Sequence, residues 1–438
     1  MICLAARLYP AVYNRQPMEP VRTLAEHLAD AAHRAPQAPA LLTSGQRWTF
    51  AELLADARTL AATVAPSRAP LALSGSSHDL ARHAFACSLK NRPFFPVDRD
   101  RPTARVDQLP AGVALVIATG GSEGEPRAVM LTDANLDAAA AASNQLLPLA
   151  AGDLWLDCLP LCHIGGLAIL WRCARAGAAV LLHEGFAAGV VAADLARHPV
   201  THLSLVPAML ASLLDAGAAP PASLRHVLVG GAALAPALHE RASAAGWPLN
   251  PSYGMSETAA QVATWTPADG PWQPGLVGRP LPGNELTLAA DGRIRVGGPQ
   301  VMRGYVGGGG VDADGWLTTG DLGEIDAAGR LTVTGRADDM LISGGHNVHP
   351  LEVEAALAAC PGIRDVAVTG LPDPVWGDLV VALVVGDAAG DEIATWCRAH
   401  LPGHARPRRI VRLAALPRSA AGKLKRVALR RLALEGMG

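Results

Sequence analysis

Residues 118–131, ATGGSEGEPRAVML, place glycines, two hydroxyl side chains and a cation in one short loop. Backbone amides that point into a concavity, together with hydroxyl donors, are suited to a polyphosphate anion. Glycine allows the close approach and the positive φ angles that such a loop needs. The loop is therefore suited to a phosphate-binding site, although one such loop taken alone is more often a solvent-exposed turn. Its candidate ligands are Thr119, Gly120, Gly121, Ser122, Gly124 and Arg127.

Two other functional loops share parts of this pattern. Gly120, Ser122 and Gly124 satisfy G-x-S-x-G, but a nucleophile elbow requires a helix directly after the serine, whereas residues 127–131 predict a second strand. A P-loop requires Gly-Lys-Ser or Gly-Lys-Thr at the start of a helix, and neither triplet occurs here. A serine hydrolase that uses Ser122 stays open as a remote alternative.

Five further stretches with acids, cations and glycines follow this loop. They are LPLCHIGGL at 159–167, SYGMSETAAQ at 252–261, GWLTTGDLGEI at 315–325, GRADDMLISGGHNVHPLEVE at 335–354 and LPRSAAGKLKR at 416–426. A single acid or lysine from any of them would ordinarily be a solvated side chain or a helix cap. Their order along one chain favours a shared function.

In this order the six stretches resemble the adenylate-forming superfamily of acyl- and aryl-CoA synthetases, peptide-synthetase adenylation domains and luciferases. The resemblance covers residues 22–431. It implies a ligase that joins a carboxylic acid to AMP, releases pyrophosphate, and then transfers the acyl group to a thiol. The implied cosubstrates and cofactors are ATP, Mg²⁺ and coenzyme A, with an acyl carrier protein as an alternative thiol.

The resemblance also implies roles for residues around the nucleotide. Glu257 would bind Mg²⁺ and Tyr253 would pack on adenine. The Asp321 carboxylate would accept both ribose hydroxyls, assisted by Arg336, because a carboxylate offers several acceptor sites. The further nucleotide ligands that it implies are Gly231, Ala232, Gly254 and Ser256.

The C-terminal part would move between the two half-reactions. Lys423 in AAGKLKR, rather than Lys425, would stabilise the charge that develops between the carboxylate and the α-phosphate, as Arg127 would on the phosphates. Asp338 matches the hinge of the family. Gly344 and Gly345 match the loop beside the pantetheine, where a side chain would block the path.

Three residues depart from the family pattern. Arg127 stands where lysine is usual, Glu123 where threonine is commoner, and His346 where glutamate is frequent. Arginine keeps the charge but replaces a point ammonium with a planar fork, so its contacts with a triphosphate differ in geometry. The chain is also short between residues 94–106 and the phosphate loop.

The stretches that would surround the acid are most similar to the o-succinylbenzoate-CoA ligases of menaquinone biosynthesis. On that resemblance, Arg172, Ser204 and Gln261 would lie near the polar groups of the acid, and His163 would form part of the wall of the acid-binding pocket. A second carboxylate on the substrate favours a buried cation. A helix-surface arginine, a packed core histidine and a different aryl or acyl acid remain the alternatives.

Apolar bursts such as VALVIAT, AAVLLH, HLSLVP and RHVLVGG predict buried parallel strands that alternate with helices up to about residue 280. From Leu286 on, ELTLAADGRIRVGG and GEIDAAGRLTVTGR predict hairpins. We expect an α/β fold: a large N-terminal domain, 1–337, of layered α/β sheets with a small β-barrel-like element, and a small mobile α+β domain, 338–438. A helix should begin at Thr132 or Asp133, and the glycines 307–310 predict a flexible loop.

The composition suits a well-buried soluble enzyme, since half of the 438 residues are apolar and 17% are charged. The formal net charge of −2 gives no overall attraction to nucleic acid or a membrane. Seven cysteines without a CxxC pair predict free thiols in a reducing cytosol rather than a zinc or disulfide framework. A homo-oligomer is compatible with this composition.

The two ends of the chain add weaker signals. The first residues lack a continuous apolar region and a cleavage signature, so we expect a cytoplasmic protein whose start is Met1 or Met18. Residues 401–431 hold ten Lys and Arg and no Asp or Glu. A nucleic-acid patch is the alternative for this segment, but it lacks the aromatic residues that would stack on bases.

Overall fold

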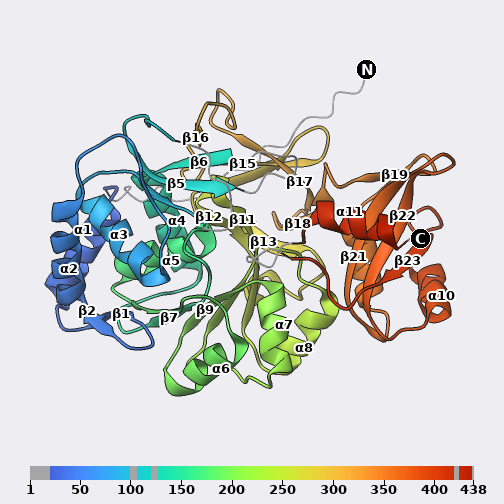
Figure 1. Cartoon of the computed structure of the whole chain (residues 1–438), viewed down its shortest axis with the longest axis horizontal. Coiled ribbons are helices and arrows are strands. Elements are labelled where there is room, and N and C mark those ends of the chain that lie inside the picture. The colour runs from blue at the N-terminus through green and yellow to red at the C-terminus, as the bar shows by residue number, and fades with distance from the viewer. Residues whose placement is uncertain (1–19, 99–105, 120–126, 419–423, 437–438) are drawn as a thin grey trace.

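The protein is described by a computed structural model that covers residues 20–98, 106–119, 127–418 and 424–436 (Figure 1). Its helices within these ranges are α1 (Leu24–Arg34), α2 (Phe50–Thr63), α3 (Ser77–Leu89), α4 (Asp133–Leu146), α5 (Ile164–Ala176), α6 (Ala188–Arg197), α7 (Pro207–Asp215), α8 (Pro236–Ala244), α9 (Pro350–Ala358), α10 (Gly390–His400) and α11 (Arg426–Glu435).

A parallel sheet forms the centre of the large N-terminal part. Its parallel strands, in spatial order, are β11 (Leu249–Met255), β10 (His226–Val229), β9 (His202–Leu205), β7 (Leu154–Asp157), β8 (Ala179–Leu182) and β1 (Pro39–Leu42), and β2 (Arg47–Thr49) closes that edge as an antiparallel strand. The prediction of parallel strands is confirmed for three of the four quoted apolar bursts. Crossover helices connect them, as parallel pairing requires.

An antiparallel extension continues from the other edge of this sheet. Its strands are β12 (Ala260–Thr264), β13 (Leu276–Pro280), β14 (Glu285–Leu288), β15 (Arg293–Gly297), β17 (Leu317–Ile325) and β18 (Leu331–Arg336). The predicted hairpins are β14–β15 and β17–β18. They belong to the same path of hydrogen-bonded strands as the parallel sheet, which they join through β13 and β12.

A second sheet carries the edges of the phosphate loop. Its strands, in order, are β16 (Gly304–Tyr305), β6 (Arg127–Thr132), β5 (Val113–Thr119), β4 (Phe94–Pro96) and β3 (Leu71–Leu73). The VALVIAT strand, β5, is parallel to β4, as its apolar pattern predicts, but antiparallel to β6, the second strand predicted after the loop. The Gly-rich loop is the reason, because a short hairpin connection can join only antiparallel strands.

The helix after the phosphate loop begins as predicted. The Thr132 side chain accepts from the backbone N–H of Asn135, and the Asn135 side chain accepts from the backbone N–H of Thr132, so Thr132 is the N-cap of α4. Strand β6 separates the loop from this helix, whereas a nucleophile elbow requires a helix directly after the serine.

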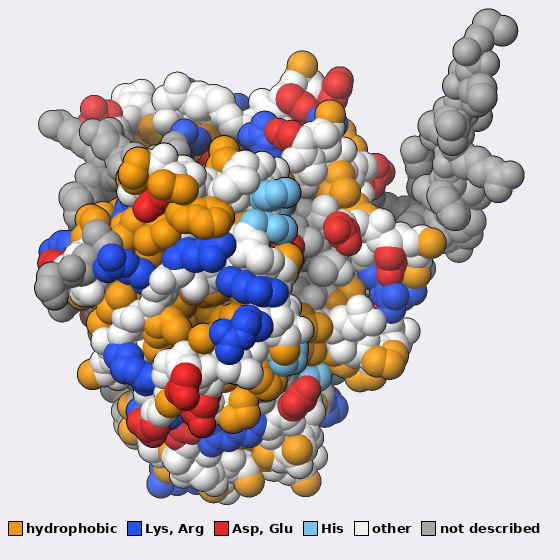
Figure 2. Space-filling view, turned by 90° about the vertical axis from the view of Figure 1, so that its right-hand side faces the viewer, with side chains coloured by type: hydrophobic (Ala, Val, Ile, Leu, Met, Phe, Trp, Pro, Cys, Tyr) orange, Lys and Arg blue, Asp and Glu red, His pale blue; other side chains and the backbone are white. Residues whose placement is uncertain are grey.

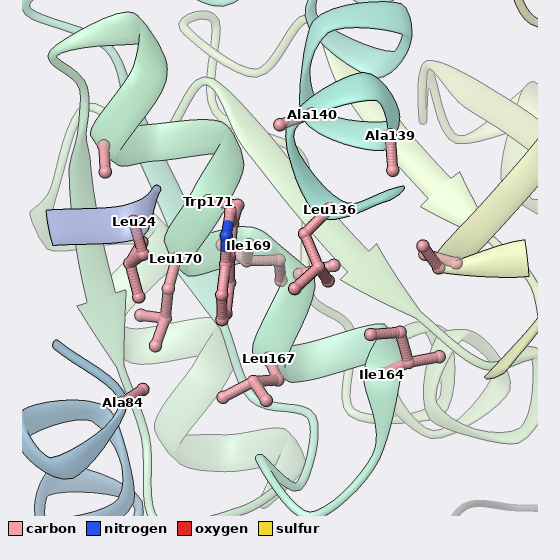
Figure 3. Close-up of a cluster of buried hydrophobic side chains, with 14 of the residues drawn as sticks. Leu24, Ala84, Leu136, Ala139, Ala140, Ile164, Leu167, Ile169, Leu170 and Trp171 are labelled. Carbon is pink, nitrogen blue, oxygen red and sulfur yellow. The ribbon is translucent and has the colours of Figure 1, made fainter. Parts of the chain in front are cut away.

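Helices α1 to α5 fill the space between the two sheets. Figure 3 shows Leu170 and Trp171 of α5 between Leu24 of α1 and Leu136 of α4. The other face of the parallel strands packs against α6, α7 and α8 in a separate apolar cluster. The parallel sheet is thus covered on both faces, which explains why its strands are almost uniformly apolar.

The C-terminal part has its own sheet, at the right of Figure 1. Its strands are β19 (Leu341–Ser343), β20 (His346–Val348), β21 (Ile363–Asp373), β22 (Gly377–Gly386) and β23 (Arg409–Arg412). Helices α9 and α10 pack in one apolar cluster with this sheet and α11 packs in another, so the mixed α+β character is as predicted. The domain boundary between residues 337 and 338 remains a prediction. In the described ranges, none of the helices is both long and apolar enough to cross a membrane.

Candidate active site

The two ends of the phosphate loop face each other across the β5–β6 hairpin. Thr119 is the last residue of β5 and pairs with Arg127, the first residue of β6. The Thr119 hydroxyl donates to the Arg127 carbonyl at 3.2 Å. Several candidate residues lie outside the described part of the chain: Gly120, Gly121, Ser122, Glu123, Gly124 and Lys423.

Arg127 and Glu257 meet at a residue that the sequence reasoning missed, Tyr305. The Arg127 guanidinium carbon lies 5.1 Å from the centre of the Tyr305 ring. The Tyr305 hydroxyl donates to Glu257 Oε1 at 2.8 Å. Burial and the adjacent Glu257 carboxylate raise the pKa of Tyr305 to about 12, so the phenol stays protonated at neutral pH and can donate a hydrogen bond. Arg127, Glu257 and Tyr305 are called the Tyr305 cluster below.

The glycine run 307–310 belongs to the surroundings of this cluster. It was predicted as a flexible loop rather than a site, and its hydrogen bonds place it against Tyr305. The Tyr305 N–H donates to the Gly309 carbonyl at 3.2 Å, and the Gly308 N–H donates to the Tyr305 carbonyl at 2.9 Å. The run is therefore a tight turn that folds back on Tyr305.

The donor set at Glu257 fits the predicted Mg²⁺. The carboxylate is half-buried, and its contact with Tyr305 uses one lone pair of one oxygen. Mg²⁺ is usually held by one or two carboxylates together with phosphate oxygens rather than by an all-protein cage. Glu257 would be such a carboxylate, and the ion would neutralise charge on the phosphates of a bound nucleotide.

A second group, the Arg336 cluster, comprises Tyr253, Asp321, Arg336 and Asp338. Asp321 on β17 lies opposite Arg336 on β18. Tyr253 Oη donates to Asp321 Oδ2 at 2.8 Å, and Arg336 Nη1 donates to Asp321 Oδ1 at 3.1 Å. Arg336 Nη2 donates to Asp338 at 3.2 Å. The structure thus brings the predicted adenine, ribose and hinge residues together.

The predicted glycine and backbone ligands follow the carboxyl ends of β10 and β11. Gly231, next to Ala232 in the β10–α8 loop, has φ +80°. A Cβ on Gly254 would lie 2.1 Å from the carbonyl oxygen of Ala260, so only glycine fits there. Ser256 begins a short 3₁₀-helix (Ser256–Thr258). Ligands of open α/β sheets bind at this edge, so these placements favour a nucleotide pocket.

The backbone after that 3₁₀-helix is strained. Ala259 and Ala260 have φ values of +51° and +110°, which alanine rarely adopts. Such outliers cluster at active sites, where the surrounding structure holds them. They lie between the predicted metal ligand, Glu257, and the predicted acid-binding residue, Gln261.

Arg172 is fully buried within α5, with 2% of its surface exposed. The alternative of a helix-surface arginine is therefore excluded. Its guanidinium lies 5.2 Å from the Trp155 ring, and Trp155 Nε1 donates to Ser204 Oγ at 3.1 Å. Trp155 was not identified from the sequence. Together these three residues form the Arg172 cluster.

The charge of Arg172 is incompletely paired by the protein. Among the described residues, its Nε and Nη1 atoms find no hydrogen-bond partner. Burial lowers the pKa of Arg172 to about 10, with the nearby Cys173 and Asp157 opposing that shift, so the side chain is cationic at neutral pH. Buried donors of this kind are costly unless another group accepts from them. An anionic ligand group would do so.

Gln261 and His163 occupy separate parts of the predicted pocket. Gln261 is buried on β12 beside Gly254 of β11, and within the described ranges neither end of its amide is hydrogen bonded. His163 is the partly exposed N-cap of α5, so it is not a packed core histidine. Arg172 lies nine positions further along the chain, about 13 Å along the helix axis. The two could flank opposite ends of a small aromatic acid.

The predicted hinge and thiol-loop residues follow β18. Gly344 and Gly345, with φ +58° and +78°, form the turn between β19 and β20. A Cβ added to Gly344 would lie 3.1 Å from the Trp376 ring. The Gly344 N–H donates to the Trp376 carbonyl at 2.8 Å. These glycines are required by the turn itself, and the role beside pantetheine stays a prediction.

Arg426, three residues after Lys423, contacts a residue next to the predicted hinge. Arg418 and Leu424 form an isolated antiparallel bridge. Arg426, at the start of α11, lies 3.3 Å from Asp339 and donates to Glu354 at 2.8 Å. These contacts tie the start of α11 to the residues that follow β18.

The basic C-terminal segment has intramolecular partners. Figure 2 shows the C-terminal face, where Lys and Arg side chains lie among hydrophobic ones. Arg408 lies 4.0 Å from the centre of the Trp376 ring, and Arg406 Nε donates to the Leu401 carbonyl at 2.8 Å. Arg412 donates to the Gly386 carbonyl at 3.1 Å. These arginines fasten β23 and its loops to the rest of the sheet.

Comparisons with known proteins agree with this geometry. A family model of AMP-binding enzymes matches residues 72–306, and one of the AMP-binding enzyme C-terminal domain matches residues 352–423. The 2-succinylbenzoate–CoA ligase of Bacillus subtilis is 36% identical over 328 residues, which are 72% of this chain and 68% of that protein.

Solved structures give the same relationship. The o-succinylbenzoate-CoA synthetase of Bacillus subtilis, in complex with its acyl-adenylate intermediate, superposes with a TM-score of 0.82 at 29% identity, covering 92% of this chain and 97% of that chain. Its complex with ATP and magnesium ion also gives 0.82 and 29%, covering 92% and 98%. By sequence and by structure, the chain belongs to the AMP-binding enzymes of the adenylate-forming superfamily.

Proposed function

We propose that this AMP-forming acid–CoA ligase takes 2-succinylbenzoate as its acid. In the first half-reaction a carboxylate oxygen attacks the α-phosphate of ATP, giving the acyl-adenylate and pyrophosphate. In the second, the coenzyme A thiolate attacks the acyl carbon and AMP leaves. The family membership and the ligase relatives support both steps, which the resemblance would place in menaquinone biosynthesis.

The proposed roles in the first step follow from charge. The carboxylate and the triphosphate repel each other, so the site must supply cations and hydrogen-bond donors. Arg127 and Lys423 would contact the reacting charge, and Glu257 would hold Mg²⁺. Asp321 would fix the ribose, since it lies beside Tyr253 and Arg336 on adjacent strands.

The buried Arg172 is the observation that carries the choice of acid. A substrate with two carboxylates presents one to ATP and keeps the other ionised. That second carboxylate could accept from Arg172 Nε and Nη1 in a dry pocket, where a charge-assisted pair is strong. Ser204 and the unpaired amide of Gln261 add polar groups to the proposed acid site.

The second step would require the C-terminal part to rotate. Asp338 is the proposed pivot, and Gly344 and Gly345 would then border the thiol path. Rotation that closes a new surface over a reactive intermediate also protects it from water. The anchoring of Arg426 to Asp339 and Glu354 supports joint movement of α11 and the Lys423 segment.

The test is acid-dependent pyrophosphate release with ATP and Mg²⁺, scanned over 2-succinylbenzoate, benzoate, 2-acetylbenzoate and fatty acids. We expect the highest kcat/KM with 2-succinylbenzoate and a thioester on adding free coenzyme A. Equal or higher activity with a monocarboxylate would refute the proposed acid. Adenylation without transfer to free coenzyme A would instead indicate a carrier-protein acceptor.

A further inference from the structure

We propose that Tyr305 is a positioning residue that holds the Glu257 carboxylate for Mg²⁺ and carries Arg127 beside it. The inference rests on the proposed functions of Glu257 and Arg127 and adds a role for a residue that belongs to none of the six sequence stretches. Its evidence is the arrangement of the Tyr305 cluster and of the turn that encloses it.

Glu257 is fixed at two points by one short segment. Its side chain accepts from Tyr305 Oη at 2.8 Å, and its carbonyl accepts from the Met302 N–H at 2.8 Å. The same segment therefore sets both the backbone and the carboxylate orientation. The second carboxylate oxygen keeps its lone pairs for a cation, because a carboxylate offers about four acceptor positions.

The segment is attached in turn to the phosphate-loop hairpin. β16 pairs with β6 so that Tyr305 lies opposite Val129. The Val306 N–H donates to the Ala128 carbonyl at 2.8 Å, and the Arg303 N–H donates to the Met130 carbonyl at 3.0 Å. Tyr305 is thus placed by the strand that begins with Arg127, which links the position of the phosphate loop to that of the metal ligand.

Arg127 lies against the same ring. A guanidinium is planar and can stack on an aromatic face, whereas an ammonium is a compact point charge. At 5.1 Å from the ring centre, Arg127 is within the range of a cation–π contact. This contact gives a structural reason for arginine where the family usually has lysine.

The glycine turn also lies against the Tyr305 ring. A Cβ on Gly310 would lie 2.7 Å from Tyr305 ring carbons and 2.4 Å from the Met302 methyl, and its φ of +96° also requires glycine. Any larger residue would displace the tyrosine. The turn therefore holds the ring in one orientation, which preorganises the groups that depend on it.

The consequence for metal binding follows from geometry. Mg²⁺ demands near-ideal octahedral coordination, so a carboxylate that can swing binds it less well. Groups that orient a metal ligand typically change metal affinity by about 10–100-fold when removed. Tyr305→Phe keeps the ring and the Arg127 contact but deletes the hydrogen bond to Glu257.

The experiment measures Mn²⁺ binding to the whole enzyme by electron paramagnetic resonance, with α,β-methylene-ATP present, for wild type, Tyr305→Phe and Gly310→Ala. We expect about 10–100-fold weaker Mn²⁺ binding in both variants. The Mg²⁺ concentration that gives half-maximal pyrophosphate release should rise by a similar factor. Thioester formation from supplied acyl-adenylate should stay at the wild-type rate. Arg295→Lys is the control outside the proposed site, where Arg295 lies 5.2 Å from the Trp316 ring. It should leave Mn²⁺ binding unchanged.

Glu257→Gln separates the inference from the function on which it rests. If Glu257→Gln weakens Mn²⁺ binding and Tyr305→Phe does not, Tyr305 has no positioning role and the proposed Mg²⁺ ligand stands. If neither variant weakens Mn²⁺ binding, Glu257 is not the metal ligand. The proposed role of Glu257 and the positioning role of Tyr305 are then both refuted. Circular dichroism and thermal melting check that each variant is folded.

The stacking contact is tested by Tyr305→Leu and Arg127→Lys, alone and combined. Each change should raise the KM for ATP several-fold. If the contact positions Arg127, the double variant should be less impaired than the product of the two single effects, because both remove the same interaction. Multiplicative effects would show that Arg127 works independently of the ring.

Discussion

Arg336 joins Asp321 to Asp338 through a single guanidinium. Its Nη1 donates to Asp321 at 3.1 Å, and its Nη2 donates to Asp338 at 3.2 Å. Asp321 is the proposed ribose ligand and Asp338 the proposed hinge. A nucleotide that binds Asp321 would therefore also act on the guanidinium that contacts Asp338.

Asp321→Asn should weaken ATP binding while leaving the fold intact. The amide can still accept one hydrogen bond, but it loses the charge that pairs with Arg336. Hydrogen bonds to charged groups contribute about 1.5–3 kcal/mol, so kcat/KM for ATP should fall about 10–100-fold. Steady-state pyrophosphate release measures this. Glu285→Gln, an exposed acid on β14, is the control, and an equal loss there would contradict the assignment.

Arg172→Met should impair use of the acid without destabilising the protein. Methionine fills part of the same volume and removes two buried donors, Nε and Nη1, that find no partner among the described residues, and buried donors left unpaired are costly. We expect an unchanged or higher melting temperature and a fall of about 100-fold or more in kcat/KM for 2-succinylbenzoate, with a smaller effect on benzoate.

Arg175→Met is the matched comparison on the same helix. Arg175 forms an ion pair with Asp137, which also contacts His27. Its loss should lower the melting temperature and leave the preference among acids unchanged. If Arg175→Met altered acid preference as much as Arg172→Met, a specific role for Arg172 would be ruled out.

His202 should make the protein sensitive to mild acid. Its ring is fully buried against Trp155 and His226, and burial, followed by the charge of His226, lowers its pKa to about 3. An unfolded histidine has a pKa of about 6.5. Between these values the unfolded chain binds a proton that the native protein does not, so the free energy of unfolding falls as pH drops through this window, by roughly 5 kcal/mol in total.

Denaturant unfolding at a series of pH values from 7 to 4 measures the slope of the free energy of unfolding against pH. His202→Phe keeps the stacking but removes the titration, so its slope should be smaller by about 1.4 kcal/mol per pH unit, the equivalent of one proton. His33→Gln, at an exposed position of α1, should keep the wild-type slope. Identical slopes for His202→Phe and wild type would show that His202 is protonated in the native state.

Lys423→Ala should separate the two half-reactions. Loss of the cation should lower pyrophosphate release by about 100-fold or more, the scale of a lost transition-state donor, while thioester formation from supplied acyl-adenylate persists. Lys425→Ala, at the N-cap of α11, should affect both steps only weakly. Equal losses in both steps for Lys423→Ala would refute its role in adenylation.

Asp338→Pro should have the opposite effect. Proline fixes its own φ and restricts Ala337 before it, so rotation at this point is hindered. The backbone hydrogen bonds here are donated by Ala337 to Gly320 and by Asp339 to Arg336, so proline at position 338 leaves both possible. Adenylation should persist and thioester formation should fall sharply. Asp338→Ala, which keeps the backbone free, should retain both activities.

Local patterns in the sequence account for much of the fold. The parallel strands β8, β9 and β10 are short apolar bursts, the hairpins β14–β15 and β17–β18 turn at glycine, and Thr132 caps α4. Each of these features depends on residues that lie close to one another in the sequence. The VALVIAT strand is parallel to β4 on one side, and its antiparallel pairing on the other side is set by the hairpin partner rather than by its own apolar pattern.

The order of six motifs along the chain determined the family, the reaction type and most of the proposed site residues. Only the tertiary structure decided that Tyr305 joins Arg127 to Glu257, that Trp155 joins Arg172 to Ser204, and that Arg172 is buried. Each of these contacts joins residues that are distant in sequence. Such contacts are set by how strands and helices pack, and a residue's type and immediate neighbours do not encode which distant side chain it will meet.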